Sequence, residues 1–455
     1  MMTSPVAAQR WLLRDVRVDG HAVDCRIAAG RVAELGPALG PAADGEHLLD
    51  GAGGALLPGL ADHHLHLFAA AAARSSVDLT GHHSLAEVVV PGGTGWLRLI
   101  GAGPAVDRAQ LDAVFPGRPV RAQHRSGALW TLNSAAIDRL GARLDAEQRR
   151  TGQLWRADAK LRVALAALGE AGSPDLPALG RELARLGVTH VTDATPDTDA
   201  VALAALTAAL PQHVLSLSSA VTAPGPVKIV VADSGLPSLE GLTARIAATH
   251  EGGRPVAVHA VTAVALALTL AALTAAGPAD GDRIEHAAVC DDAGADRIAE
   301  LGVTVVTQPS VWARRGPEFL RESPPDERPL LWRFRSLLDR GVQVAVSSDA
   351  PYGDISPWQA IRAAVTRRPA GRLDERVRAE IVLGTQLTDP LRPAGPPRLV
   401  APGVPADLML LEAHFAAALD SVVAGGPPPV RAVFIRGVPV FPPPASAGTW
   451  PASRA

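Results

Sequence analysis

The chain has 455 residues, a formal net charge of -3 at pH 7 and only two cysteines. This length suits one large barrel with a smaller appended domain. The balanced charge gives no basic stripe that would attract nucleic acid or a membrane surface, so neither is an expected partner, and homo-oligomerisation is left open. Cys25 and Cys290 stand far apart in no CxxC arrangement, which excludes a disulfide framework and a thiolate zinc site.

No stretch of the sequence predicts export or membrane insertion. Residues 1–20 carry alternating charges and lack the apolar run of a signal peptide. The longest apolar stretch, 261–276, is shorter than the roughly 18 to 20 residues that a bilayer span needs. A cytoplasmic protein is therefore expected.

Both ends of the chain predict short strands. Residues 11–54 contain brief apolar alternations broken by Gly and Asp, and a similar pattern returns near the other end, after a Pro-rich stretch. We expect residues 1–54 and 391–441 to build one small β-sandwich domain. Residues 442–455 are expected to be a frayed tail.

The middle of the chain, 55–390, alternates short β-branched strands with Ala- and Leu-rich helices, as is typical of βαβ units. It predicts an α/β fold, a (β/α)8 TIM barrel. Residues from about 70 to 170 fit no place in the strand count, so we expect an insertion after the first strand that could form a lid. The eight expected strands are 55–66, 188–193, 213–218, 227–231, 256–259, 283–286, 303–308 and 342–349.

Polar side chains end several of these strands, which is where (β/α)8 enzymes place their active sites. Successive side chains of a strand point to opposite faces, so His64 and His66, two residues apart, point the same way, toward a common ion. An HxH pair alone is equally typical of ordinary histidines, but further donors here end separate strands. The candidate metal ligands are His64, His66, Lys228, His259, His286 and Asp349.

The opening motif P-G-x-x-D-x-H-x-H, from Pro58 to His66, resembles that of the amidohydrolase superfamily. The segments VKIVVADSG, VAVHA, RIEHA, VTQPS and SSDAP are similar to the amidohydrolase-3 family, relatives of N-substituted formamide deformylases and D-aminoacylases. The resemblance covers nearly the whole chain. It implies a metal-dependent hydrolase that cleaves a C–N bond in a small molecule, with an N-acyl or N-formyl amine as the expected substrate.

The resemblance also implies a role for Lys228. In relatives with two metals, the matching lysine is carboxylated and its carbamate bridges the ions, so His64 and His66 would hold one ion and His259 and His286 the other. A buried lysine amine can lose its proton and capture CO2, whereas a guanidinium cannot. The expected cofactor is two divalent ions, zinc by preference. One ion, with Lys228 in an ordinary salt bridge, is the alternative.

The expected mechanism follows from the chemistry of such an ion. Bound water has its pKa lowered from about 15.7 to about 7, and the scissile carbonyl is polarised, so a metal-bound hydroxide attacks the amide. Asp349 is expected to be both a ligand and the catalytic proton shuttle, from the attacking water to the leaving amine. Asp62 is expected to brace the site through hydrogen bonds, and His63, which points the other way, to be structural.

Four further residues are candidates for substrate binding. The segment from Gln123 to Ser134 resembles the family's G-H-x-x-x-x-N-S stretch, except that Ala128 replaces the usual His. His124 is the candidate to replace the substrate contact of that histidine. The set is His124, Asn133, Asp193 and Gln308, each equally typical of an ordinary polar group.

Other functions use the same residues differently. Opening of a cyclic amide, or deamination of a heterocycle, would employ the same barrel. Deaminases carry an HxxE motif in this region, whereas His259 is followed by Ala260-Val261-Thr262. A catalytically dead barrel acting as a binding protein typically loses metal ligands, and this chain keeps the full set.

Overall fold

The computed structural model describes residues 9–442, apart from 83, 171, 173, 223 and 368–373. The chain divides into two compact units, Met1–Leu67 with Leu176–Ala455, and Phe68–Asp175. Of the expected tail, residues 443–455 lie outside the described part. Among the described helices, none combines the length and apolar character needed to cross a membrane.

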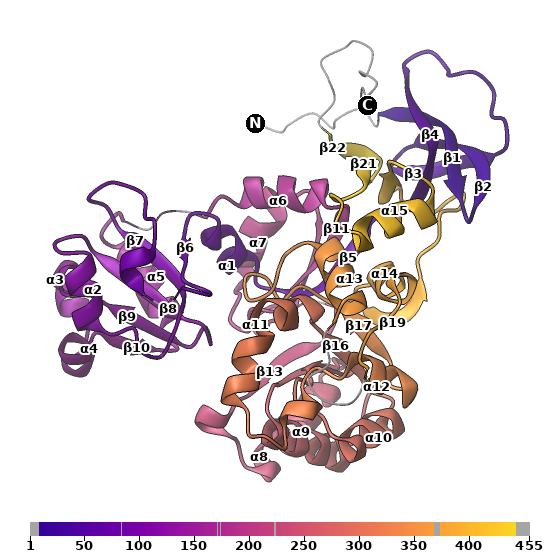
Figure 1. Ribbon diagram of the computed structural model, residues 1–455. Coiled ribbons are helices and arrows are strands. Elements are labelled where there is room, and N and C mark those ends of the chain that lie inside the picture. Colours follow the sequence, from indigo (N-terminus) through magenta and orange to yellow (C-terminus); the bar gives the residue numbers. More distant parts are fainter. Residues whose placement is uncertain are drawn as a thin grey trace. The chain divides into compact units, whose positions relative to one another are not determined.

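Eight parallel strands form a barrel in the first unit (Figure 1). They are β5 (Leu60–Leu65), β11 (Val188–Asp193), β12 (His213–Ser216), β13 (Val227–Val231), β14 (Val256–Ala260), β15 (Arg283–His286), β16 (Thr304–Thr307) and β17 (Val344–Val346). They pair in the orders β12-β11-β5 and β13-β14-β15-β16-β17. Backbone hydrogen bonds join the two sets, from Lys228 N to Leu217 O (2.7 Å) and from Asp349 N to His64 O (2.8 Å). The strands therefore close into a ring.

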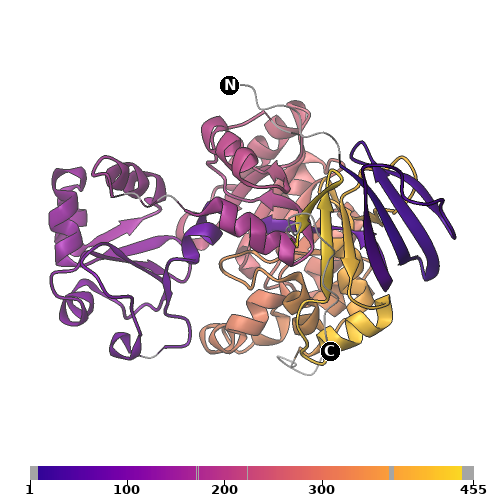
Figure 2. The same ribbon diagram turned by 90° about the horizontal axis from the view of Figure 1, so that it is seen from above.

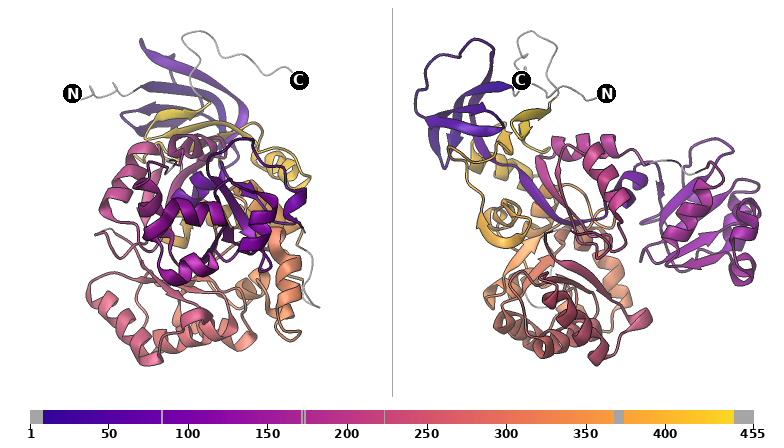
Figure 3. Two further views of the ribbon diagram at one scale, coloured as in Figure 1. Left: turned by 90° about the vertical axis from the view of Figure 1, so that its left-hand side faces the viewer. Right: turned by 180° about the vertical axis from the view of Figure 1, so that it is seen from behind.

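Helices cover the outside of these strands (Figures 1 and 3). They are α6 (Leu176–Arg185), α7 (Ala200–Ala209), α8 (Leu239–Glu251), α9 (Ala263–Ala276), α10 (Asp292–Leu301), α11 (Pro309–Glu322), α12 (Phe334–Asp339), α13 (Pro357–Val365) and α14 (Ala379–Gln386). Asp199, Ser238, Thr262 and Asp291 each accept a hydrogen bond from the backbone three residues on, which starts α7, α8, α9 and α10. These caps fix the lengths of the loops that follow the strands.

Both ends of the chain contribute to one seven-stranded sheet (Figure 2). Its strands are β1 (Arg10–Val18), β2 (His21–Ala28), β3 (Arg31–Gly36), β4 (Glu46–Pro58), β20 (Leu408–Leu411), β21 (Val430–Ile435) and β22 (Val438–Phe441), and α15 (Phe415–Val423) lies between β20 and β21 in the sequence. The order β22-β21-β20-β4-β1-β2-β3 is continuous through β4. Both ends also group with the barrel in one unit, so the structure does not establish a separate β-sandwich domain.

The second unit has a core of its own. Its elements are β6 (Val77–Asp78), β7 (Leu97–Ala102), α2 (Arg108–Val114), β8 (Val120–His124), β9 (Leu129–Leu132), α3 (Ser134–Leu140), α4 (Ala146–Thr151), β10 (Gln153–Trp155) and α5 (Asp158–Ala166), after α1 (Leu67–Ala73). The strands pair in the order β10-β9-β8-β7-β6. One apolar cluster surrounds Leu132 and Leu140, and another surrounds Leu99 and Leu111.

The barrel and the seven-stranded sheet meet at a polar junction at the start of β11 and β12. The rings of His190 and His213 stack with their centroids 4.5 Å apart. Arg398 donates to Nδ1 of His190 and Arg436 to Nδ1 of His213, each over 3.0 Å. Because each Nδ1 accepts, the ring proton lies on Nε2, and His213 donates it to Asp407 over 3.0 Å.

Truncation of a core side chain tests the packing of the sheet. Phe434 is 1% exposed, and its ring lies 5.5 Å from that of Trp11. Phe434→Ala should cost about 3 to 5 kcal/mol because it leaves a cavity. Urea denaturation followed by tryptophan fluorescence measures the loss. Leu48→Ala, at a side chain that is 61% exposed, is the control and should change stability by less than about 0.5 kcal/mol; equal losses would contradict the packing described.

Because His190 is partly buried in the polar junction, we expect the protein to lose stability in mild acid. Burial and the guanidinium of Arg398 lower the pKa of His190 well below its ordinary value of 6.5. The unfolded chain protonates this ring first, so stability present above about pH 6.5 falls as the pH drops below it, by at most about 1.4 kcal/mol per pH unit. Melting temperatures between pH 7.5 and 5.5 should fall less steeply in His190→Gln, which keeps an acceptor for Arg398. An identical slope would refute this origin.

Candidate metal centre

His64, His66 and Asp349 lie together where the ring of strands closes. Asp349 Oδ1 is 3.6 Å from His64 Nε2 and 3.5 Å from His66 Nε2. One nitrogen or oxygen atom of each residue lies within 4.8 Å of the others, as a shared cation requires. The hydrogen bond from Asp349 N to His64 O fixes this approach.

The other three expected ligands adjoin this group. Lys228 Nζ lies 3.1 Å from His64 Nε2. The ring of His286 lies 5.0 Å from that of His64 and 4.6 Å from that of His259, and its Nδ1 lies 4.0 Å from Asp349 Oδ2. His64, His66, His259, His286 and Asp349 lie at or just beyond the carboxyl ends of β5, β14, β15 and β17. Lys228 lies near the start of β13, and its side chain reaches the same cluster.

Two of these residues have left-handed backbone. The φ angle is 75° at His286 and 51° at Asp349. A residue other than glycine in this region costs roughly 1 to 3 kcal/mol, and such residues cluster at functional sites. Both residues follow a barrel strand or end one, so these turns direct their side chains into the cluster.

The protonation of the cluster suits a cation. Burial lowers the pKa of Lys228 to about 8, and burial together with Lys228 lowers that of His64 well below its ordinary value. Burial alone would raise the pKa of Asp349, but the facing histidines hold it below its ordinary value. Unprotonated imidazoles and an ionised carboxylate are donors that a divalent metal needs, and the lowered pKa of Lys228 makes it easier for its amine to lose a proton, so these residues fit such an ion.

Asp62 and His63 support the first strand. Asp62 Oδ1 accepts from the backbone N–H groups of His64 and Ser348, each over 3.2 Å, and burial raises its pKa to about 6. It therefore ties β5 to the end of β17. His63 points away from the cluster, and its Nε2 donates to Thr385 O over 2.9 Å.

Gln308, expected to contact a substrate, instead supports a histidine. It is fully buried, and its Oε1 accepts from His286 Nδ1 over 2.8 Å. Its amide nitrogen donates to Val306 O (2.9 Å) and Ser347 Oγ (3.0 Å). The amide is thus used within the protein, and it leaves the Nε2 lone pair of His286 for a cation.

Asp193 is likewise used within the protein rather than offered to a substrate. It is fully buried and accepts from Leu67 N (3.0 Å), Thr195 Oγ1 (3.1 Å) and Thr198 Oγ1 (2.8 Å). Burial raises its pKa. Because Leu67 directly follows His66, this carboxylate anchors the chain just beyond His66.

His124 and Asn133 belong to the second unit. Asn133 is fully buried, and its Oδ1 accepts from Val120 N (2.9 Å) and Ala136 N (3.0 Å). Its nitrogen donates to two backbone carbonyls, so the amide caps α3 and has no atom left for a substrate. His124 Nδ1 pairs with Ser126 Oγ over 2.8 Å. Its substrate role stays a prediction.

Two buried charged residues at the cluster were missed by sequence reasoning. Glu285 accepts from His64 Nδ1 and pairs through its other oxygen with Arg283. Glu285 is 0% exposed and Arg283 is 1% exposed. The signal was present in RIEH, because charged residues two apart on a barrel strand share one face and are rarely buried without purpose.

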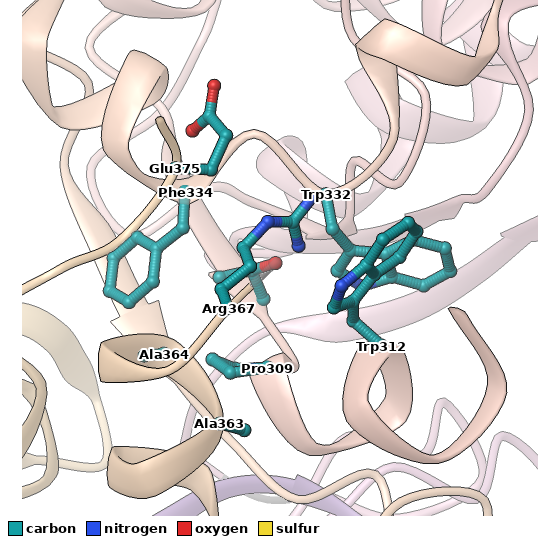
Figure 4. A pocket seen from close by; sticks show the side chains of 9 residues that line it. Pro309, Trp312, Trp332, Phe334, Ala363, Ala364, Arg367 and Glu375 are labelled. Carbon is teal, nitrogen blue, oxygen red and sulfur yellow. The ribbon is translucent and has the colours of Figure 1, made fainter. Parts of the chain in front are cut away.

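Two other features resemble sites. A cavity beside α11 and α13 is lined in part by Trp312, Trp332, Arg367 and Glu375 (Figure 4). Its volume of about 10 Å³ is near the least that holds one water, so it is no substrate pocket. The histidine and aspartate side chains of the polar junction also lie within reach of one cation. There the arginines occupy both Nδ1 atoms and leave protons on Nε2, which opposes metal binding.

Comparison with known proteins places the chain in a family. The model of the amidohydrolase family matches residues 47–441. The N-substituted formamide deformylase of Arthrobacter pascens is 31% identical over 118 residues, 25% of this chain and 22% of that protein. Protein LONG AFTER FAR-RED 3 of Arabidopsis thaliana is 32% identical over 136 residues, 27% of this chain and 22% of that protein. The chain spans about a quarter of the length of the curated relatives it matches.

Solved structures share the fold. An uncharacterized metal-dependent hydrolase from Pyrococcus furiosus aligns with a TM-score of 0.63 and 21% identity, over 88% of this chain and 98% of that one. N-isopropylammelide isopropylaminohydrolase from Burkholderia multivorans aligns with a TM-score of 0.53 and 20% identity, over 95% and 98%. Because the family model matches most of the sequence, and these barrel structures align along most of its length, the chain belongs to the amidohydrolase family.

Proposed function

We propose that this protein is a metal-dependent hydrolase that cleaves the C–N bond of a small N-acyl or N-formyl amine. The observation that carries the proposal is that six candidate metal ligands from five barrel strands lie in one cluster. Membership of the amidohydrolase family supports hydrolysis of an amide. The relative named as an N-substituted formamide deformylase favours an acyl amine as the substrate class.

We propose that the chain divides at the positions that its sequence predicts. Residues 55–390 form the catalytic barrel, with an insertion at about 70–170. Residues 1–54 and 391–441 form the appended β-domain. The proposed partner is a small-molecule substrate, and the proposed location is the cytoplasm.

The proposed cofactor is a pair of zinc ions bridged by carboxylated Lys228. The buried amine attacks the carbon of CO2, an N–C bond forms, and the displaced proton leaves to solvent. The resulting carbamate would offer two oxygens as ligands to a pair of ions. Atrazine chlorohydrolase TrzN of Arthrobacter aurescens, a protein of similar fold with a TM-score of 0.57, was solved as a mutant complexed with zinc. A single ion, with Lys228 kept as a cation near Asp349, is the alternative.

The chain's own residues supply binding, orientation and proton transfer. A bound divalent ion supplies the Lewis acid that activates water and polarises a carbonyl near neutral pH. Asp349, kept ionised by the facing histidines, takes a proton from the attacking water and delivers it to the nitrogen of the leaving amine. The side chains of His66 and Asp349 are 22% and 12% exposed, whereas that of His64 is fully buried. Substrate therefore approaches from the side of His66 and Asp349.

Two rival functions share this barrel. Heterocycle or cyclic amide hydrolysis is the first, and the Burkholderia multivorans structure of similar fold is named as an isopropylaminohydrolase of N-isopropylammelide. A substrate screen separates the classes by including aminopurines and cyclic amides beside acyl amines. A binding protein without activity is disfavoured because the full donor set is retained.

Metal content tests the proposed centre. Plasma mass spectrometry should find close to two ions per wild-type chain, and fewer in Lys228→Ala because the bridge is lost. Lys160→Ala, at the only other lysine of the chain, is the matched control and should keep the wild-type content. About one ion per chain in both the wild type and Lys228→Ala would favour the single-ion alternative. A metal-free wild-type chain would overturn the proposed function.

Removal of the proton shuttle tests the role of Asp349. Asp349→Asn keeps the shape of the side chain but cannot accept the proton, so kcat on the best acyl amine should fall by about 10² to 10⁴. Metal content measured on the same sample separates lost proton transfer from lost ligation. Undiminished kcat would contradict the assignment.

A further inference from the structure

Arg283 and Glu285 lie on the Nδ1 side of the His64 ring. Lys228 and Asp349 lie on its Nε2 side. We infer that Glu285, held by Arg283, is a positioning residue that fixes His64 as the strongest histidine donor to the metal. This inference rests on the proposed metal-dependent function. It concerns a part of the centre that lies outside the six proposed ligands.

The orientation of His64 follows from what its two nitrogens face. Its Nδ1 faces the carboxylate of Glu285. An ionised carboxylate only accepts hydrogen bonds, so the proton lies on Nδ1 and the Nε2 lone pair remains. That Nε2 points toward Lys228 Nζ at 3.1 Å and Asp349 Oδ1 at 3.6 Å, which is the side where the other donors gather.

Arg283 holds both the carboxylate and the strand that carries the histidine. Its Nε pairs with the second oxygen of Glu285, and its Nη2 donates to the carbonyl of His63 over 3.1 Å. His63 immediately precedes His64. Since β15 and β5 are not neighbours in either strand order, this contact crosses the barrel interior. It therefore fixes the ring and the backbone of His64 together.

Thermodynamic stability alone does not account for this pair. Buried ion pairs can often be replaced by apolar residues without loss of stability, because the desolvation of both charges offsets their attraction. Glu285 and Arg283 are almost fully buried. A role at the adjacent centre explains why the charges are kept there.

The groups that face Nδ1 of His64, His66 and His286 do not all carry the same charge. His66 Nδ1 faces the hydroxyl of Thr195 at 3.3 Å, and His286 Nδ1 faces the amide of Gln308 at 2.8 Å. Both partners are neutral, whereas His64 faces a carboxylate. A carboxylate behind a ligating imidazole raises its basicity, and loss of such partners typically weakens metal affinity by about 10- to 100-fold.

Two substitutions at Glu285 separate charge from hydrogen bonding. Glu285→Gln keeps an oxygen that can accept from His64 but removes the charge, whereas Glu285→Ala removes both. Zinc affinity, measured on the full chain by competition with a chelator, should fall about 10-fold in the first and up to about 100-fold in the second. Equal affinity of Glu285→Gln and wild type would overturn the inference while leaving the proposed function intact.

Two further variants guard against a general loss of structure. Glu375→Gln removes another nearly buried carboxylate, which accepts from Ser336 N (2.9 Å) and faces Arg333; zinc affinity should be unchanged. The double variant Arg283→Met/Glu285→Gln leaves no unpaired guanidinium, so it should regain stability yet still bind zinc weakly. Wild-type affinity in the double variant would overturn the inference. A wild-type chain that binds no zinc would overturn the proposed function and this inference with it.

Discussion

The closure of the barrel between its first and last strands is the constraint on which the centre depends. Asp349 N donates to His64 O, and His66 N donates to Ala350 O over 2.9 Å, which joins segments almost three hundred residues apart. Without these bonds the histidine pair and the aspartate would not share one position. His259 and His286 join them because parallel strands bring their carboxyl ends to the same edge, whereas Lys228 reaches the cluster from near the start of its strand.

Around this closure, the polar groups form two layers. The inner layer contains the six proposed ligands, and the outer layer contains the groups that orient them. Asp62 holds the backbone of the first strand, Gln308 orients one ring, and Glu285 orients another. The buried charges are acceptable because each has a defined partner, whereas an isolated buried charge would be strongly unfavourable.

The six residues of the inner layer, and Asp62 behind them, could be proposed from the sequence, whereas the other groups of the outer layer could not. The strands and the His64 and His66 pair follow from periodicity and from the common edge of parallel strands. Gln308 and Asp193 were assigned to substrate because a position at a strand end does not reveal how deeply a side chain is buried. Asn133 precedes a helix, where an amide caps as readily as it binds a ligand. Glu285 escaped notice because the histidine that it contacts lies on another strand across the barrel, and nothing in the sequence links the two residues.

The anchoring of Leu67 by Asp193 has a consequence for how such a protein can diversify. The chain leaves the first unit after Leu67, one residue beyond His66, and returns at Leu176. The carboxylate of Asp193 accepts a hydrogen bond from the backbone N–H of Leu67, the first residue after His66. A displacement of the chain beyond Leu67 therefore strains this hydrogen bond before it moves His66. The second unit, Phe68–Asp175, can therefore change its sequence and structure in evolution without displacing His66.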